Sequence, residues 1–148
     1  MSYAVDTNIL IYASDRGSPF FERAAVFLKA SIGSDDVMCL SWATVMAYLR
    51  IVTHPSLLTT PLTPDEAMLN MESLFQMPNV RVLIEDDGFW NVYRDVARDL
   101  VVRGNLVPDA HLAALLKQHG VTTLYTNDTG FRRFAFLKVL NPFDDNRR

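Results

Sequence analysis

Several features are scarce in this 148-residue chain, and each shortage excludes a class of protein. A single cysteine, Cys39, permits neither a disulfide framework nor a thiolate zinc cluster within the chain. It lies in the apolar run VMCLS, where we expect a buried thiol in a reducing, cytoplasmic compartment. No apolar run approaches the roughly 18–20 residues of a membrane-spanning helix. The start MSYAVDTNIL lacks a basic region and a cleavage pattern, so we expect neither a signal peptide nor a membrane segment.

Positive charge is also in short supply. The chain has 14 Lys and Arg against 17 Asp and Glu, which gives a net charge of −3. This balance argues against a module that binds nucleic acid through bulk positive charge. It leaves a nuclease open, because an acidic site attracts phosphate once cations occupy it.

The chain has enough apolar residues to fill a core. Hydrophobic residues make up 49% of it and charged residues 21%, with no internal repeat, low-complexity tract or linker in view. Because domains commonly hold about 100–150 residues, we expect one domain over residues 1–148.

Apolar strands alternate with amphipathic helices along the chain. Strands are expected over residues 3–5, 37–40, 80–84, 121–126 and 138–142. Helices are expected over residues 20–31, 42–52, 64–77, 88–104 and 109–119, with a break at 105–108. Trp42, Trp90 and the phenylalanines fall at core spacing, so we expect them in the core and not on a base-stacking surface. This alternation indicates an α/β fold whose mostly parallel central sheet is flanked by helices on both faces, in three layers.

Three aspartates follow elements that meet at one edge of such a sheet. Asp6 follows the first strand, Asp128 follows the fourth, and Asp109 begins a helix after Pro108. Ligands bind beyond the carboxyl ends of parallel strands, so these side chains should lie together. Clustered carboxylates repel one another, and a divalent cation relieves that repulsion; oxygen ligands favour Mg²⁺ or Mn²⁺. Each aspartate alone could equally be a turn or helix cap.

The sequence motifs around these aspartates resemble those of a known family. They are VDTNIL near the N-terminus, SWATVMAYLRIVTHP in the middle, GNLVPDAHLAAL, and LYTNDTGFRRF before KVLNPF. In this order they resemble the PIN-domain ribonucleases, and more narrowly the VapC toxins of bacterial VapBC toxin–antitoxin pairs. The resemblance covers nearly the whole chain and implies a single PIN-like domain.

The resemblance implies four acidic residues that bind Mg²⁺ or Mn²⁺ and cleave RNA, leaving a 5′-phosphate and a 3′-hydroxyl. Asp6, Asp109 and Asp128 match the first, third and fourth. The second is a glutamate in a motif such as AEFLR. The corresponding segment here is MAYLR, so Ala47 occupies the place of that glutamate. A further acid often follows two residues after the fourth and corresponds to Gly130. Natural decay and deliberate inactivation both explain Ala47; we favour the second, because an active toxin kills its expression host.

Other residues receive supporting roles in this hypothesis. Asp6 and Asp109 are expected as primary metal ligands, with Asp128 acting through water. Asn8 and Thr126 are expected to orient the ligands. The arginines near the predicted site are the candidate phosphate contacts, although each could equally be a solvated surface residue. They are Arg16, Arg132 and Arg133.

The sequence thus predicts a metal-dependent endoribonuclease toxin, attenuated or inactive because of Ala47. The expected partners are RNA, a VapB-type antitoxin and a second copy of the chain, without a membrane. The alternative is a non-cleaving module that binds RNA or antitoxin. A phosphohydrolase of the haloacid-dehalogenase type fits less well, because it needs an aspartate where this chain has Asn8.

Overall fold

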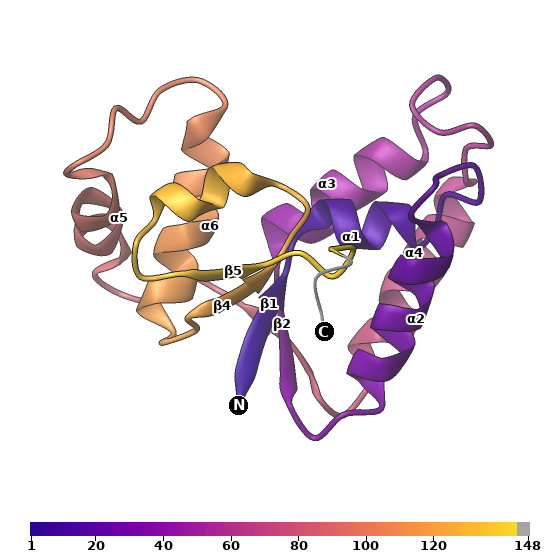
Figure 1. Ribbon diagram of the computed structural model, residues 1–148, viewed down its shortest axis with the longest axis horizontal. Coiled ribbons are helices and arrows are strands. Elements are labelled where there is room, and N and C mark those ends of the chain that lie inside the picture. The colour runs from indigo at the N-terminus through magenta and orange to yellow at the C-terminus, as the bar shows by residue number, and fades with distance from the viewer. Residues whose placement is uncertain (145–148) are drawn as a thin grey trace.

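The computed structural model describes residues 1–144, and one five-stranded sheet runs through its centre (Figure 1). The strands are β1 (Ser2–Val5), β2 (Val37–Ser41), β3 (Val80–Leu83), β4 (Thr123–Tyr125) and β5 (Lys138–Leu140). Their order is β3-β2-β1-β4-β5, and every neighbouring pair is parallel. The predicted three-layer α/β architecture is confirmed.

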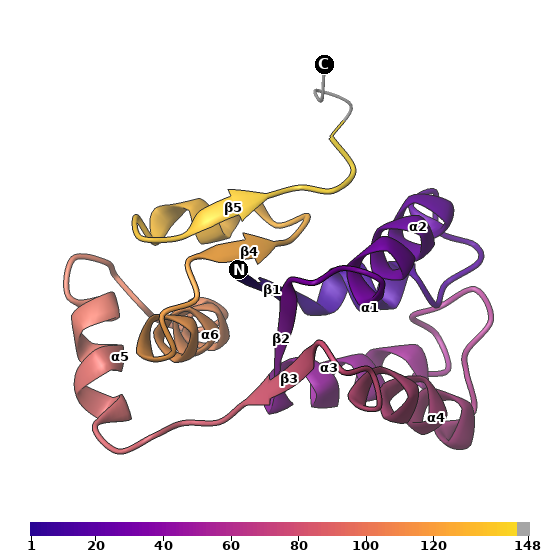
Figure 2. The same cartoon turned by 90° about the horizontal axis from the view of Figure 1, so that it is seen from below.

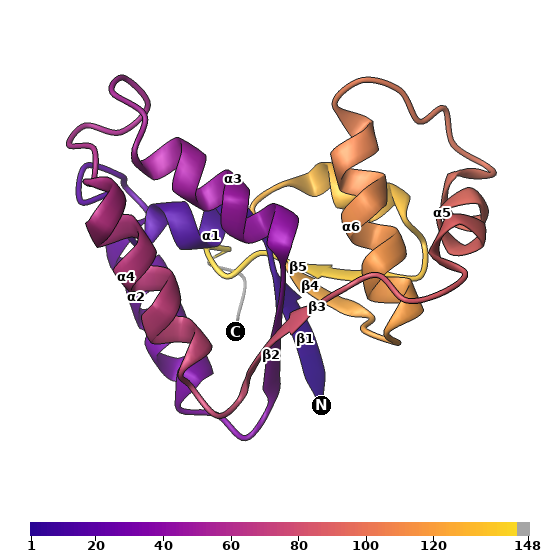
Figure 3. The same ribbon diagram turned by 180° about the vertical axis from the view of Figure 1, so that it is seen from behind.

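Within residues 1–144, six α-helices and one short 3₁₀ helix connect the strands. They are α1 (Thr7–Tyr12), α2 (Phe21–Ile32), α3 (Trp42–Val52), α4 (Pro64–Phe75), α5 (Phe89–Ala97), α6 (Leu106–Gln118) and η1 (Thr129–Arg133). Figures 2 and 3 show α1 to α4 on one side of the sheet and α5 and α6 on the other. Within the described residues, no helix is both long enough and apolar enough to cross a membrane.

Strand residues alternate between two cores because successive side chains point to opposite faces of a sheet. Tyr3 and Val5 pack with α1 to α4, whereas Ala4 between them packs with α6 and η1. Cys39 joins the second core and is buried, as its apolar surroundings predicted. Both faces of the sheet are therefore covered by helices.

Local capping explains where two of the helices begin. The Ser41 hydroxyl accepts from the Thr44 backbone N–H at the start of α3, and the Thr63 hydroxyl accepts from the Glu66 N–H at the start of α4. Pro64 occupies the first turn of α4, where a missing N–H costs nothing. These two starts lie where the sequence predicted them.

The segment around α5 and α6 differs from its prediction. α5 ends at Ala97 instead of near residue 104, and α6 begins at Leu106 instead of Asp109. Pro108 lies in the first turn of α6, where N–H groups have no partner within the helix, so it does not break the helix. Asp109 is thus inside the first turn of α6 and is not its cap.

The two tryptophans also differ from their prediction. Trp42 is 46% exposed and Trp90 is 65% exposed, so their expected placement in the core is wrong. α5 contributes no buried residue and packs mainly along α6, at the margin of the second core. The apolar residues at helical spacing on α5 therefore face the second core only in part.

Candidate active site

The sheet reverses its strand order between β1 and β4. From β1 the chain proceeds outward through β2 and β3, and it later returns to place β4 and β5 on the other side of β1. In open α/β sheets the crevice at the carboxyl ends of such strands receives ligands. Asp6 directly follows β1, and Thr126 directly follows β4.

Asp6 is held by two neighbours. It is the N-cap of α1, and its Oδ1 accepts from the Thr7 backbone N–H at 2.8 Å. Its Oδ2 accepts from the Thr126 hydroxyl at 2.7 Å. Burial raises the pKa of Asp6, the two hydrogen bonds oppose this, and repulsion from Asp128 raises the pKa further. The carboxylate is therefore fixed in orientation while its negative charge is poorly compensated.

The hydroxyl of Thr126 links both strand ends. It donates to Asp6 and accepts from the Asn8 side-chain amide at 3.1 Å and from the Asp128 backbone N–H at 2.9 Å. A hydroxyl has one donor and two acceptor positions, so this one is fully used. Thr126 is 1% exposed, and its contacts orient Asp6 and the backbone that carries Asp128.

A second row of polar contacts supports this arrangement. The Asn127 N–H donates to Asn8 Oδ1 at 3.3 Å, and Asn141 Nδ2 donates to Asn127 Oδ1 at 2.8 Å. The Asn127 amide also lies 3.4 Å from the Tyr12 hydroxyl. Asn141 and Tyr12 were not among the predicted site residues, because the sequence gives no sign that α1 and the end of β5 meet the turn after β4.

Asp109 approaches the same region from α6. Its pKa is raised to about 6, first by burial and then by repulsion from Asp128 and Asp6, while Arg133 lowers it. Repulsion of this kind requires that the three carboxylates lie near one another. The structure thus brings the three predicted aspartates into one region of negative charge.

Asp128 is exposed, and its Oδ1 accepts from the Gly130 N–H at 2.8 Å as the cap of η1. A Cβ added at Gly130 would lie 2.9 Å from that oxygen. An acidic side chain at position 130 would therefore displace the Asp128 carboxylate from this bond.

Ala47 is half-buried on α3. It lies one turn after Ala43, and helix neighbours four residues apart share a face. α3 packs against α1, whose cap is Asp6. No described contact joins Ala47 to the three aspartates, so its role as the missing fourth acid stays a prediction.

The candidate phosphate contacts fall into two groups. Arg133 is exposed and near enough to Asp109 to lower its pKa. Arg16, in the loop between α1 and α2, and Arg132 are exposed, and no described contact links them to the aspartates. His54 is also exposed, just after α3, and its Nδ1 accepts from the Ser56 N–H.

The chemistry of this region suits a hard cation. The ligand atoms it offers are the carboxylate oxygens of Asp6, Asp109 and Asp128, which Mg²⁺ and Mn²⁺ prefer. Across residues 1–144, no three His, Cys, Asp or Glu side chains are gathered closely enough to hold a metal ion as they are placed. The region therefore combines carboxylate oxygens with negative charge, without three such side chains already gathered into a coordination shell among the described residues.

Comparison with known proteins agrees with this arrangement. Residues 3–137 match the PIN domain family. Ribonuclease VapC48 of Mycobacterium tuberculosis is 42% identical over 143 residues, which are 97% of this chain and 99% of the relative.

Solved structures share the fold. VapBC-1 from nontypeable Haemophilus influenzae superposes with a TM-score of 0.69 at 19% identity, covering 97% of this chain and 100% of that one. Mycobacterium tuberculosis VapC20, described as a Sarcin-Ricin loop cleaving toxin, gives a TM-score of 0.65 at 17% identity, covering 88% and 92%. The chain therefore belongs to the PIN-domain family, among the VapC ribonucleases.

Proposed function

We propose that this chain is a metal-dependent endoribonuclease of the VapC type, the toxin of a toxin–antitoxin pair, built as one domain over residues 1–148. The observation that carries the proposal is the Thr126 hydroxyl, which fixes Asp6 and the Asp128 backbone beside Asp109 at the reversal of strand order. The 42% identity to a VapC ribonuclease over nearly the whole chain supports the reaction class.

Asp6 and Asp109 would hold a divalent ion, Mg²⁺ or Mn²⁺, with Asp128 linked through water. When bound, such an ion orients the scissile phosphate, lowers the pKa of the attacking water and stabilises the added negative charge. Thr126 and Asn8 keep Asp6 in one orientation. Arg133 would contact the phosphate backbone beside Asp109, and Arg16 and Arg132 would contact it further away.

The titration of Asp109 makes metal binding dependent on pH. A proton and a cation compete for the same carboxylate, so affinity should rise as pH rises through the pKa of about 6. A Mn²⁺ titration followed by calorimetry should therefore show clearly stronger binding at about pH 7.5 than at about pH 5. Asp109→Asn should bind weakly at both pH values. Equal binding by this variant and the parent chain would remove Asp109 from the site.

The partner should be a small VapB-type antitoxin. VapBC structures share this fold, and an arginine-bearing segment suits the negatively charged site. Co-expression with the protein of the neighbouring reading frame should give a complex that survives affinity purification. Light scattering of that complex should report two copies of this chain, since we also propose a homodimer. Recovery of the chain alone and monomeric would contradict both partner proposals.

A non-cleaving module that binds RNA or antitoxin is the second candidate, and Ala47 is the observation that favours it. Such a module would keep the fold and the three aspartates and would lose turnover. The Ala47 substitution described in the Discussion separates the two candidates.

A further inference from the structure

An aromatic groove opens at the start of α6, where Pro108 lines it and Asp109 follows in the sequence. It has a volume of about 640 Å³ and is walled by α5, the first turn of α6 and the start of α3. Its lining includes Phe89, Trp90 and Tyr93 of α5, Pro108 and His111 of α6, and Ala43 of α3. We call this set the aromatic groove.

The groove presents an open indole. Trp90 is 65% exposed and stacks on Tyr93, with ring centres 5.5 Å apart and planes inclined by 15°. Because Tyr93 covers one face of the indole at most, the other side remains accessible. A large aromatic side chain left open to solvent forgoes the stabilisation that burial would give.

The wall opposite Trp90 is held in place. Phe89 packs edge-on against His111, with ring centres 5.6 Å apart. His111 Nε2 contacts Glu85 Oε1 at 2.5 Å, which ties α6 to the segment after β3. The groove is therefore preformed.

Two helices lead from the groove to the proposed site. Pro108 lines the groove and is followed directly by Asp109. Ala43 lines it from α3, and Ala47 lies one turn later on the same helix face. An RNA strand that places a phosphate at the aspartates would thus have a neighbouring nucleotide at the groove.

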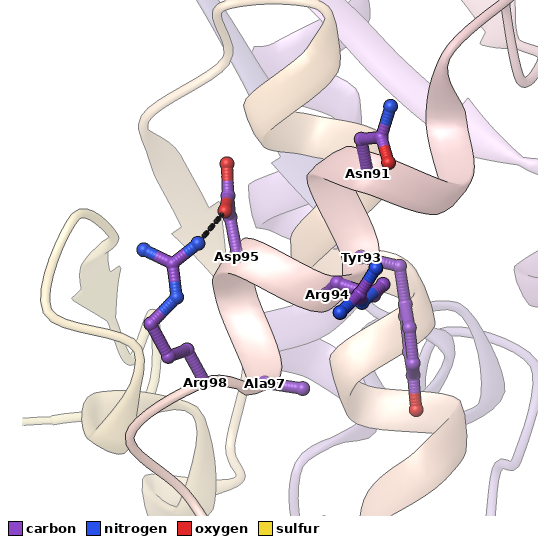
Figure 4. Close-up of a pocket in the computed structure, with 6 residues that line it drawn as sticks. All are labelled: Asn91, Tyr93, Arg94, Asp95, Ala97 and Arg98. Carbon is purple, nitrogen blue, oxygen red and sulfur yellow. Dashed lines mark hydrogen bonds and ion pairs between the residues drawn. The ribbon is translucent and has the colours of Figure 1, made fainter.

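A cation lies in the hollow next to the groove: Arg94 lines that hollow together with Tyr93, which also lines the groove. Arg94 follows Trp90 by four residues on α5, which puts both side chains on one face of the helix. Figure 4 shows Arg98 turned toward Asp95 on one side of α5, with Tyr93 extending from the other and Arg94 next to it. Among the described residues Arg94 has no ion-pair partner, so its charge is available.

We propose that the aromatic groove stacks a base of single-stranded RNA adjacent to the scissile phosphate, with Arg94 contacting the backbone. This inference rests on the proposed function and names how its substrate is held. Stacking on aromatic rings beside a cation is how proteins grip single-stranded nucleic acid, because every base has a flat π-face. The site itself is negatively charged and repels RNA, so the RNA must be bound by contacts outside the aspartates.

Fluorescence of Trp90 tests the proposal without any cleavage. In Trp42→Phe the indole of Trp90 is the only one, since the chain has two tryptophans. With EDTA present, a short single-stranded oligoribonucleotide should quench it, and an abasic oligomer of equal length and charge should not. Trp90→Leu should weaken binding of the same RNA, labelled with a dye, about tenfold. Arg94→Gln should weaken binding and reduce its salt dependence by about one charge.

Val101→Ala is the matched control, because Val101 is a 77% exposed apolar residue outside the groove and should not affect binding. Equal quenching by the abasic oligomer, or none by RNA, would overturn the proposal. Quenching only by the antitoxin, or only on self-association, would assign the groove to a protein partner and overturn it too.

These outcomes are separable from failure of the proposed function. Binding in EDTA requires neither a metal ion nor turnover. If the restored Ala47→Glu protein cuts RNA, adding Trp90→Leu should raise KM with little change in kcat, as expected for a substrate grip. If that protein cuts nothing while base-dependent quenching persists, the groove stands and the enzyme assignment falls.

Discussion

Ala47→Glu should convert this chain from a nearly silent protein into a metal-dependent ribonuclease. A carboxylate at position 47 would add a fourth oxygen ligand from α3 to a region where three aspartates already repel one another. Ligands and charges that act in the transition state commonly contribute about 10²–10⁴ in rate, so cleavage of single-stranded RNA should rise by that factor with Mn²⁺. Expression without the antitoxin should become toxic.

Two further variants serve as controls for this result. Ala47→Gln has nearly the shape of Ala47→Glu without its charge, and it should stay silent. Asp6→Asn in the restored protein should abolish cleavage again. Both Ala47 variants should fold normally, because glutamate and glutamine, like alanine, are good helix formers. An Ala47→Glu protein that expresses harmlessly and cuts no RNA with either metal would favour the binding module.

Thr126→Val should both destabilise the protein and weaken its metal site. Valine keeps the shape of threonine but removes a hydroxyl that serves Asp6, Asn8 and the Asp128 N–H. A buried hydrogen bond to a charged group contributes about 1.5–3 kcal/mol, so the free energy of unfolding should fall by about 2–4 kcal/mol. Loss of a partner that orients a metal ligand should reduce Mn²⁺ affinity about 10–100-fold.

Thr126→Ser is the matched control because it keeps the hydroxyl and loses only a methyl group. It should retain most of the Mn²⁺ affinity, measured by calorimetry, and most of the stability, measured by denaturant unfolding. If Thr126→Val lowered stability while metal affinity stayed at the parent value, the hydroxyl would be structural alone.

Most helices and strands could be predicted from the sequence because local signals determine where they begin. Ser41 and Thr63 are capping residues placed just before helical periodicity, and α3 and α4 begin at the next residue. Two short elements were not predicted. One is η1, and the other is α1, which is six residues long and too short to show a helical repeat. Its one signal was Asp6, which we considered as a turn or helix cap as well as a metal ligand, without predicting a helix after it.

From the sequence, only those site residues that directly follow a strand could be brought together. That Asp6 and Asp128 meet follows from the parallel sheet, but the contacts among Asn127, Asn141 and Tyr12 depend on tertiary packing. Trp90 shows the opposite failure. Helical spacing predicted burial for it, yet spacing reports which residues share a face and not what covers that face.

The pairing of β1 with β4 sets when the site can come into being during synthesis. The Thr126 hydroxyl bonds Asp6 across 120 residues, and Asp128 follows it within the last part of the chain. A growing chain leaves the ribosome N-terminal end first, and β1, β2 and β3 are neighbours that can associate before β4 exists. Asp6 then lacks the Thr126 hydroxyl and the nearby Asp128 carboxylate. An unfinished chain therefore cannot assemble the proposed site, which forms only once the turn after β4 has left the ribosome.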